Sequence, residues 1–170
     1  MRVVVQRVSE SNVRISGDVR GEIGKGFMVL VSFVDDDTDG DLDWMSNKII
    51  NLRIFNDEEG KMNKSLLDVG GNILLISQFT LHGSTKKGNR PSFIKAAKPE
   101  YANQMYEKFI EVLENSLGKK IQTGEFGGDM KVSLINDGPT TIIIDSKSCL
   151  LYTSDAADEG LGVDLGGRRI

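Results

Sequence analysis

Several residues that could take part in chemistry lie in one short stretch, Ser77-Gln78-Phe79-Thr80, followed by His82. Hydroxyl and amide groups at the end of an apolar run need hydrogen-bond partners, and a bound ligand is one such partner. Bonds to the neighbouring backbone would satisfy Ser77 and Thr80 equally well. The stretch therefore indicates either a small polar binding site or an ordinary strand end.

His82 is the one histidine of the chain, so a Ser-His-Asp arrangement would have to use it. If the stretch continues as a strand, Thr80 and His82 share one face. A single histidine at a strand end is more often a surface residue. The acidic segment 35–40 matches half of a calcium-binding loop, but Ser46 stands where glutamate is required. We expect no metal, no cofactor and none of the usual side-chain catalytic groups.

A second polar segment, Asn136-Asp137-Gly138-Pro139, lies between two predicted strands. A tight hairpin turn is the ordinary interpretation of such a sequence. An X-Pro bond is cis in only about 5–6% of folded cases, so the local sequence favours a trans bond before Pro139.

Charge is distributed unevenly along the chain. The whole chain has a net charge of −4, which argues against a protein that coats nucleic acid non-specifically. Residues 69–99 contain no acidic residue but five basic ones, Lys86, Lys87, Arg90, Lys95 and Lys98. This segment is either a solvated loop or a phosphate-binding strip beside the polar stretch.

Two helices and several strands are predicted to position these residues. Residues 27–34 and 72–81 are apolar runs with the length of buried strands. The apolar spacing between residues 42 and 52 predicts a helix that begins near Thr38, and a second helix runs from Pro99 to Gly118. The sequence therefore predicts an α/β domain with layered, mixed, largely antiparallel sheets and two main helices.

The last 22 residues, 149–170, do not fit this pattern. They resemble a translated sequencing adapter, so we exclude them from the fold and expect a disordered, dispensable, non-native tail. Residues 1–148 form the single predicted domain and contain no cysteine, which excludes thiol catalysis. No apolar run reaches the roughly 18 residues of a membrane span, and no export signal is present. We expect a cytoplasmic protein.

Seven ordered blocks cover essentially residues 1–146: MRVVVQRV, NLRIF, GKMNKSLLDVGG, SQFTL, KKGNRPSF, GEFGGDM and NDGPTT. Together they resemble the D-aminoacyl-tRNA deacylase family. Its members hydrolyse the ester that joins a D-amino acid to the 3′-terminal adenosine of tRNA. Thr140 is a departure, because the family usually has valine after the Gly-Pro pair.

The resemblance implies roles for particular residues. Four would form the active-site strand: Ser77, Gln78, Phe79 and Thr80. Two would form a cis dipeptide that selects chirality in the pocket of a homodimer partner: Gly138 and Pro139. Three would support the substrate site. Phe126 and Met130 would form the wall on the adenosine side, and Arg7 would brace the Gly-Pro segment. Three basic residues would bind the tRNA: Lys86, Lys87 and Arg90.

The resemblance also implies a mechanism. Two carbonyls of the Gly-cisPro segment would bind the substrate α-ammonium, and fixed backbone would exclude an L side chain. A side chain at Gly138 would block the substrate, and a glycyl ester would pass the same filter. The terminal ribose 2′-hydroxyl would assist the attacking water, while Thr80 positions groups rather than attacks. Two alternatives are a non-catalytic module that binds the tRNA 3′-end or a nucleotide, and a metabolite esterase with His82 as base.

Overall fold

The computed structural model describes residues 1–148, so the expectations for 149–170 lie outside the described residues. The elements follow one another as β1 (Arg2–Ile15), β2 (Asp18–Ile23), β3 (Gly26–Ser32), α1 (Asp39–Asn51), β4 (Phe55–Asn56), β5 (Met62–Lys64), β6 (Asn72–Ser77), the 3-10 turn η1 (Phe79–His82), α2 (Pro99–Leu117), β7 (Gln122–Thr123) and β8 (Met130–Asp145).

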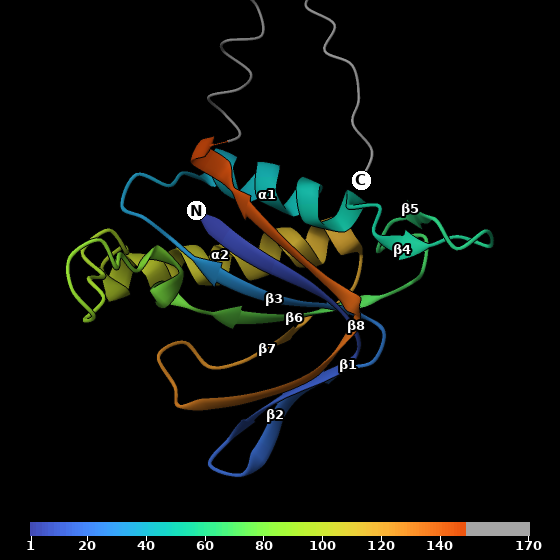
Figure 1. The fold of residues 1–170 in the computed structure, drawn as a ribbon, viewed down its shortest axis with the longest axis horizontal. Coiled ribbons are helices and arrows are strands. Elements are labelled where there is room, and N and C mark those ends of the chain that lie inside the picture. Colours follow the sequence, from blue (N-terminus) through green and yellow to red (C-terminus); the bar gives the residue numbers. More distant parts are fainter. Residues whose placement is uncertain (149–170) are drawn as a thin grey trace, which may run out of the picture.

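A mixed sheet forms the centre of the fold (Figure 1). Its strand order is β2-β1-β3-β6-β7, and β8 pairs with β1 outside this path. β1 is antiparallel to β2, β3 and β8, whereas β6 is parallel to both β3 and β7. The predicted fold class, a layered and largely antiparallel α/β domain with two main helices, is confirmed.

Both helices lie on one side of the central strands (Figure 1). α1 begins after Thr38, whose backbone amide donates to the Asp41 carboxylate at 2.9 Å and so forms part of a capping box. α2 begins at Pro99 and is closed by Gly118 in the left-handed region, with φ +73°. Both helix predictions are confirmed. Within residues 1–148, neither helix is long and apolar enough to span a membrane.

β3 and β6 are buried on both faces, which explains their continuous apolar sequences. Ile73 and Leu75 of β6 belong to the core beneath the helices. Leu74 and Ile76 belong to a second core, which the outer parts of β1, β2 and β8 cover. Side chains alternate along a strand, so successive residues of β6 fill the two cores in turn.

The prediction of one strand through residue 81 is wrong, because β6 ends at Ser77. Its partner β3 ends at Ser32, and the amide of Gln78 makes the final bond to the carbonyl of Val31 at 2.7 Å. Beyond this point the chain has no strand to pair with. It turns instead into η1.

The hairpin interpretation of residues 136–139 is also wrong. β8 passes through this segment and pairs with β1 on both sides of it. Gln6 pairs with Thr141 and Val8 with Asn136, so residues 137–140 together face the single residue Arg7. The segment is therefore a large β-bulge, which redirects the chain without ending the strand.

Candidate active site

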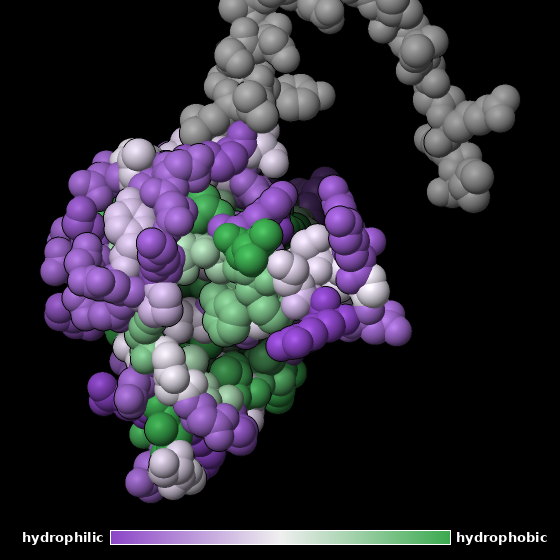
Figure 2. Space-filling model, turned by 90° about the vertical axis from the view of Figure 1, so that its left-hand side faces the viewer, coloured by the Kyte–Doolittle hydropathy of each residue, from purple (hydrophilic) through white to green (hydrophobic). Residues whose placement is uncertain are grey.

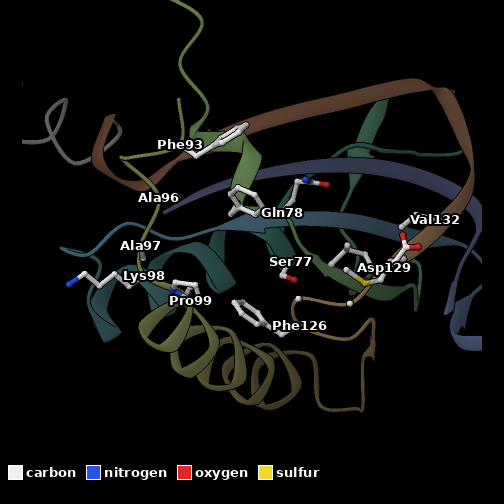
Figure 3. Close-up of a pocket in the computed structure, with 16 residues that line it drawn as sticks. Ser77, Gln78, Phe93, Ala96, Ala97, Lys98, Pro99, Phe126, Asp129 and Val132 are labelled. Carbon is white, nitrogen blue, oxygen red and sulfur yellow. The ribbon is translucent and has the colours of Figure 1, made fainter. Parts of the chain in front are cut away.

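A pocket of about 750 Å³ lies between the end of β6, η1 and the beginning of α2 (Figure 3). Five residues predicted for the site line it together: Ser77, Gln78, Phe79, Phe126 and Met130. Figure 3 shows Ser77 and Phe126 among the side chains that surround this pocket. The fold therefore brings the polar stretch and the β7–β8 connection to one cavity, although they are about fifty residues apart in the sequence.

The mouth of this pocket is largely apolar. Figure 2 shows the corresponding face, where hydrophobic surface gathers at the centre and hydrophilic residues surround it. Phe79 is 58% exposed, and its ring packs edge-on against Phe93 with 5.2 Å between the ring centroids. A concave apolar site with a few polar groups is typical of ligand binding. Phe93 is a pocket residue that was not predicted from the sequence, although it lies within the KKGNRPSF block.

Few ionisable groups line the pocket within the described chain. They are Lys98 and Asp129, and the Asp129 carboxylate pairs with the Lys131 ammonium at 2.6 Å. The pocket therefore presents the Ser77 hydroxyl and the Gln78 amide as its neutral polar side chains. Within residues 1–148, no group of three His, Cys, Asp or Glu side chains could hold a metal ion.

Thr80 lies beside the pocket rather than in its wall. Its side chain is exposed, and its hydroxyl accepts a hydrogen bond from the side-chain amide of Gln78. Thr80 can therefore orient Gln78, which itself lines the pocket.

His82 is not the surface residue that the sequence predicts. It is buried, and its Nδ1 lies 2.7 Å from Oγ of Ser32. Burial, with a smaller contribution from the Arg2 guanidinium, lowers the pKa of the His82 imidazole below its usual value. The expectation that Thr80 and His82 share a strand face is wrong, since residues two apart on a 3-10 turn lie on different sides.

The Gly138–Pro139 bulge is held by its own chain. Its peptide bond is cis, as the resemblance implies and against the local statistics. The Arg7 side chain is buried, and its Nε donates to the carbonyl of Asp137 at 2.9 Å. The Asn136 side chain accepts from the amide of Thr140, also at 2.9 Å. Arg7 thus makes the contact expected of a brace.

Gly138 is required by the backbone of the bulge itself. Its φ is +135°, and a Cβ there would lie 2.5 Å from Thr140 Oγ1 and 2.8 Å from Arg7 Nη2. The expectation that this Cβ would occupy substrate space is therefore incomplete, because the atom would first meet the protein's own residues.

The bulge does not line the pocket of its own chain. Pairing across the sheet connects Ser77 through Val31 to Val3, whereas the bulge lies opposite Arg7. Arg7 lies four positions beyond Val3 along β1, or roughly 13 Å along the strand. Gly138 and Pro139 are nevertheless exposed. One chain therefore presents the pocket and the bulge as two separate surfaces.

The three predicted tRNA-binding residues Lys86, Lys87 and Arg90 are exposed on one loop. Reciprocal backbone hydrogen bonds between Ser84 and Ser92, of 2.8 and 2.9 Å, close the base of this loop. None of the three basic residues lines the larger pocket. Phe93, the next residue after the base, connects the loop to the pocket wall.

Comparison with known proteins identifies the family of the chain. A family model described as D-Tyr-tRNA(Tyr) deacylase matches residues 4–145. The chain belongs to this deacylase family. Relatives named D-aminoacyl-tRNA deacylase, from Flavobacterium johnsoniae and Bacteroides thetaiotaomicron, are 59% and 60% identical to the chain over 148 residues. Each match covers 87% of this chain and 99% of the relative.

Solved structures also resemble the deacylase fold described above. One, described as "c-Myc DNA Unwinding Element Binding Protein", is 41% identical with a TM-score of 0.81 and covers 85% of this chain and 98% of that chain. Another, described as a probable eukaryotic D-amino acid tRNA deacylase, is 19% identical with a TM-score of 0.74 over 84% of this chain and 97% of that chain, and supports the fold alone.

Proposed function

We propose that this protein hydrolyses the ester of D-aminoacyl-tRNA, and of glycyl-tRNA, to free amino acid and tRNA in the cytoplasm. The observation that carries the proposal is the single pocket that joins Ser77, Gln78 and Phe79 to Phe126 and Met130. An aminoacyl-adenosine has a flat aromatic base, whose faces can pack against apolar side chains, and a polar ester, and this pocket offers both kinds of surface. Family membership supports the same reaction.

In this proposal the pocket positions the reacting groups rather than supplying a strong base. The aminoacyl ester is already activated, and the neighbouring 2′-hydroxyl of the ribose assists the attacking water. Backbone amides or side chains of residues 77–80 donate to the oxygen that becomes negative as water adds to the carbonyl. Thr80 contributes by orienting the Gln78 amide.

We infer that the chiral filter is completed by a second copy of the chain. The bulge is exposed, braced by Arg7, and far from its own pocket. It lies on β8, whose outer edge has no strand partner within residues 1–148. The same strand exposes Ile135 by 54% and Ile143 by 69%. A long edge strand with exposed apolar side chains is suited to association with another molecule.

Selection in this arrangement depends on rigid backbone. Carbonyls beside Gly138 and Pro139 of one subunit would accept from the α-ammonium of the substrate in the other subunit's pocket. A D side chain would then point outward, whereas an L side chain would collide with the bulge. Glycine has no side chain to collide. The basic residues Lys86, Lys87 and Arg90 would attract the tRNA backbone toward the pocket.

The proposal is tested by hydrolysis of D-tyrosyl-tRNA and L-tyrosyl-tRNA in parallel. We expect rapid turnover of the D ester and none of the L ester above the spontaneous rate. Binding of D-tyrosyl-tRNA without turnover would support the non-catalytic module instead. His82→Ala should retain D-specific activity, because its imidazole is buried against Ser32. Loss of all activity in a folded His82→Ala variant would support an esterase that uses histidine.

A further inference from the structure

A second, smaller pocket lies at the other end of η1 from the candidate active site. Its volume is about 310 Å³. Phe79, at one end of the turn, lines the larger pocket, and His82, at the other end, lines the smaller one. Its remaining lining residues combine cations, hydroxyls and a glycine: Arg2, Gly83, Ser84, Thr85, Lys86 and Lys95. No carboxylate belongs to this lining.

Two of the three cations are available to a ligand. None of the ion pairs formed within residues 1–148 involves Lys86 or Lys95. Arg2 is instead fixed, because its Nη2 pairs with Asp145 at 2.8 Å and its Nη1 donates to the carbonyl of Leu81 at 2.8 Å. Arg2 is therefore held in place by the protein, whereas the ammonium groups of Lys86 and Lys95 can pair with an anion.

Contacts of the Phe93 ring join the two pockets. Phe93 packs on Phe79, and it approaches Gly83 so closely that a Cβ there would lie 2.9 Å from Phe93 Cε1. The loop that carries the lysines is thus held against η1. A 3-10 helix rises about 2 Å per residue, so Phe79 and His82, three residues apart, are separated by roughly 6 Å along the turn.

We propose that the smaller pocket binds a phosphate group, and that in the substrate complex this group is a backbone phosphate of the tRNA acceptor end. The inference rests on the proposed function, since an adenosine placed in the larger pocket brings the preceding phosphodiester with it. Lysine ammonium groups and the hydroxyls of Ser84 and Thr85 are suitable donors to phosphate oxygens. The proposal adds Lys95 and Thr85 to the residues that would contact the tRNA, and it locates these contacts in the smaller pocket.

The test compares two substrates that differ only beyond the terminal adenosine: D-tyrosyl-tRNA and 3′-O-D-tyrosyl-adenosine. Lys95→Ala should lower kcat/KM for the tRNA about tenfold and leave the adenosine ester unchanged. It should also flatten the plot of log(kcat/KM) against log[salt] by about 0.7, as expected for one lost phosphate contact on a single strand. Lys95→Arg should preserve activity. Lys61→Ala, an exposed lysine in the β4–β5 hairpin, is the matched control and should match the unchanged protein.

Several results would overturn this assignment. An equal loss on both substrates would place the effect of Lys95 in the larger pocket or the fold. No loss on either would show that the pocket does not contact the tRNA. Binding of inorganic phosphate is measured by titration as a further test. If Lys95→Ala weakens phosphate binding but leaves tRNA hydrolysis unchanged, the pocket binds a free anion rather than the tRNA. If the unchanged protein hydrolyses neither ester, the proposed function fails, and this inference fails with it.

Discussion

The Gly138–Pro139 bulge and the rim of the larger pocket are both exposed, but they are held in different ways. The backbone of the bulge is fixed by two hydrogen bonds. The buried Arg7 guanidinium donates to the carbonyl of Asp137, and the Asn136 side chain accepts from the amide of Thr140. The rim consists of the exposed Phe79 and of Thr80, whose hydroxyl makes its one side-chain hydrogen bond within residues 1–148 with the Gln78 amide. The bulge therefore presents braced backbone, whereas the rim presents side chains on a short 3-10 turn.

This difference separates two tasks of the proposed reaction. Rejection of an L substrate requires atoms that do not yield, which the braced bulge provides. Positioning of an activated ester requires several weak polar contacts, which the rim provides. Changes to the bulge should therefore have larger effects than changes to the rim. The following predictions test that order.

The largest effect is expected for Gly138→Ala. The new Cβ would lie 2.5 Å from Thr140 Oγ1 in a backbone with φ +135°, so the bulge must distort. We expect kcat/KM for D-tyrosyl-tRNA to fall by at least about 100-fold, with a loss of about 1–3 kcal/mol in the free energy of unfolding. Deacylation assays and denaturant unfolding measure the two effects. The control Gly60→Ala also changes a glycine with a positive φ, +78°, but one with open space around it, and should lose stability without losing activity. Equal activity losses in the two variants would contradict a special role for the bulge.

Arg7→Lys should have the next largest effect. Lysine keeps the charge but cannot reproduce the guanidinium fork that reaches the carbonyls of Asp137 and Ile54. We expect about a tenfold loss of D-specific turnover and a loss of about 1–3 kcal/mol in stability. Arg53→Lys is the matched control, because Arg53 also donates to a backbone carbonyl, that of Asn63, but is exposed. Full D-specific activity in Arg7→Lys would show that the brace is dispensable.

Thr80→Ala tests the rim and should have a modest effect. Removal of one hydrogen bond to the Gln78 amide should reduce kcat by less than about tenfold, since a neutral hydrogen bond contributes about 0.5–1.5 kcal/mol. Single-turnover kinetics separate this step from tRNA binding. An inactive variant that folds and still binds tRNA would support a covalent mechanism in which the Thr80 hydroxyl attacks the ester.

The smallest effect concerns the frame of the bulge. Thr140 is buried, and its Oγ1 has no hydrogen-bond partner within the described chain. Thr140→Val removes this unsatisfied hydroxyl and should stabilise the protein by about 1 kcal/mol, raising the Tm by about 2–4 °C. Thr141→Val is the control, because the Thr141 hydroxyl accepts from Asn136 at 3.0 Å and its removal should bring no gain. A lower Tm for Thr140→Val would mean that the hydroxyl has a partner.

The sequence predicts features that depend on local chemistry. The capped helix after Thr38, the helix that starts at Pro99 and the two apolar strands all follow from residues close to one another in the chain. The turn after Ser77 does not, because it depends on where the partner strand β3 ends. The buried position of His82 follows from that same turn.

The bulge illustrates a second limit of the sequence. The polar segment with glycine and proline reads as a hairpin locally, and only the pairing of β8 with β1 on both sides makes it a bulge. Local chemistry indicates Ser77 and Gln78, whereas Phe126 and Met130 follow from the family resemblance alone, because they carry no local signal that connects them to Ser77. The structure supplies that connection.

The central claim, that one subunit's bulge completes the other subunit's pocket, is tested most directly by mixing two inactive variants. Gly138→Ala damages the bulge, and Ala96→Trp fills the pocket wall with a large side chain. After equal mixing and reassembly, half of the dimers are mixed, and each mixed dimer has one intact pocket facing one intact bulge. If the bulge of one subunit completes the pocket of the other, the mixture should hydrolyse D-tyrosyl-tRNA with about a quarter of the unchanged protein's activity. No recovery of activity, with mixed dimers shown to form, would contradict it.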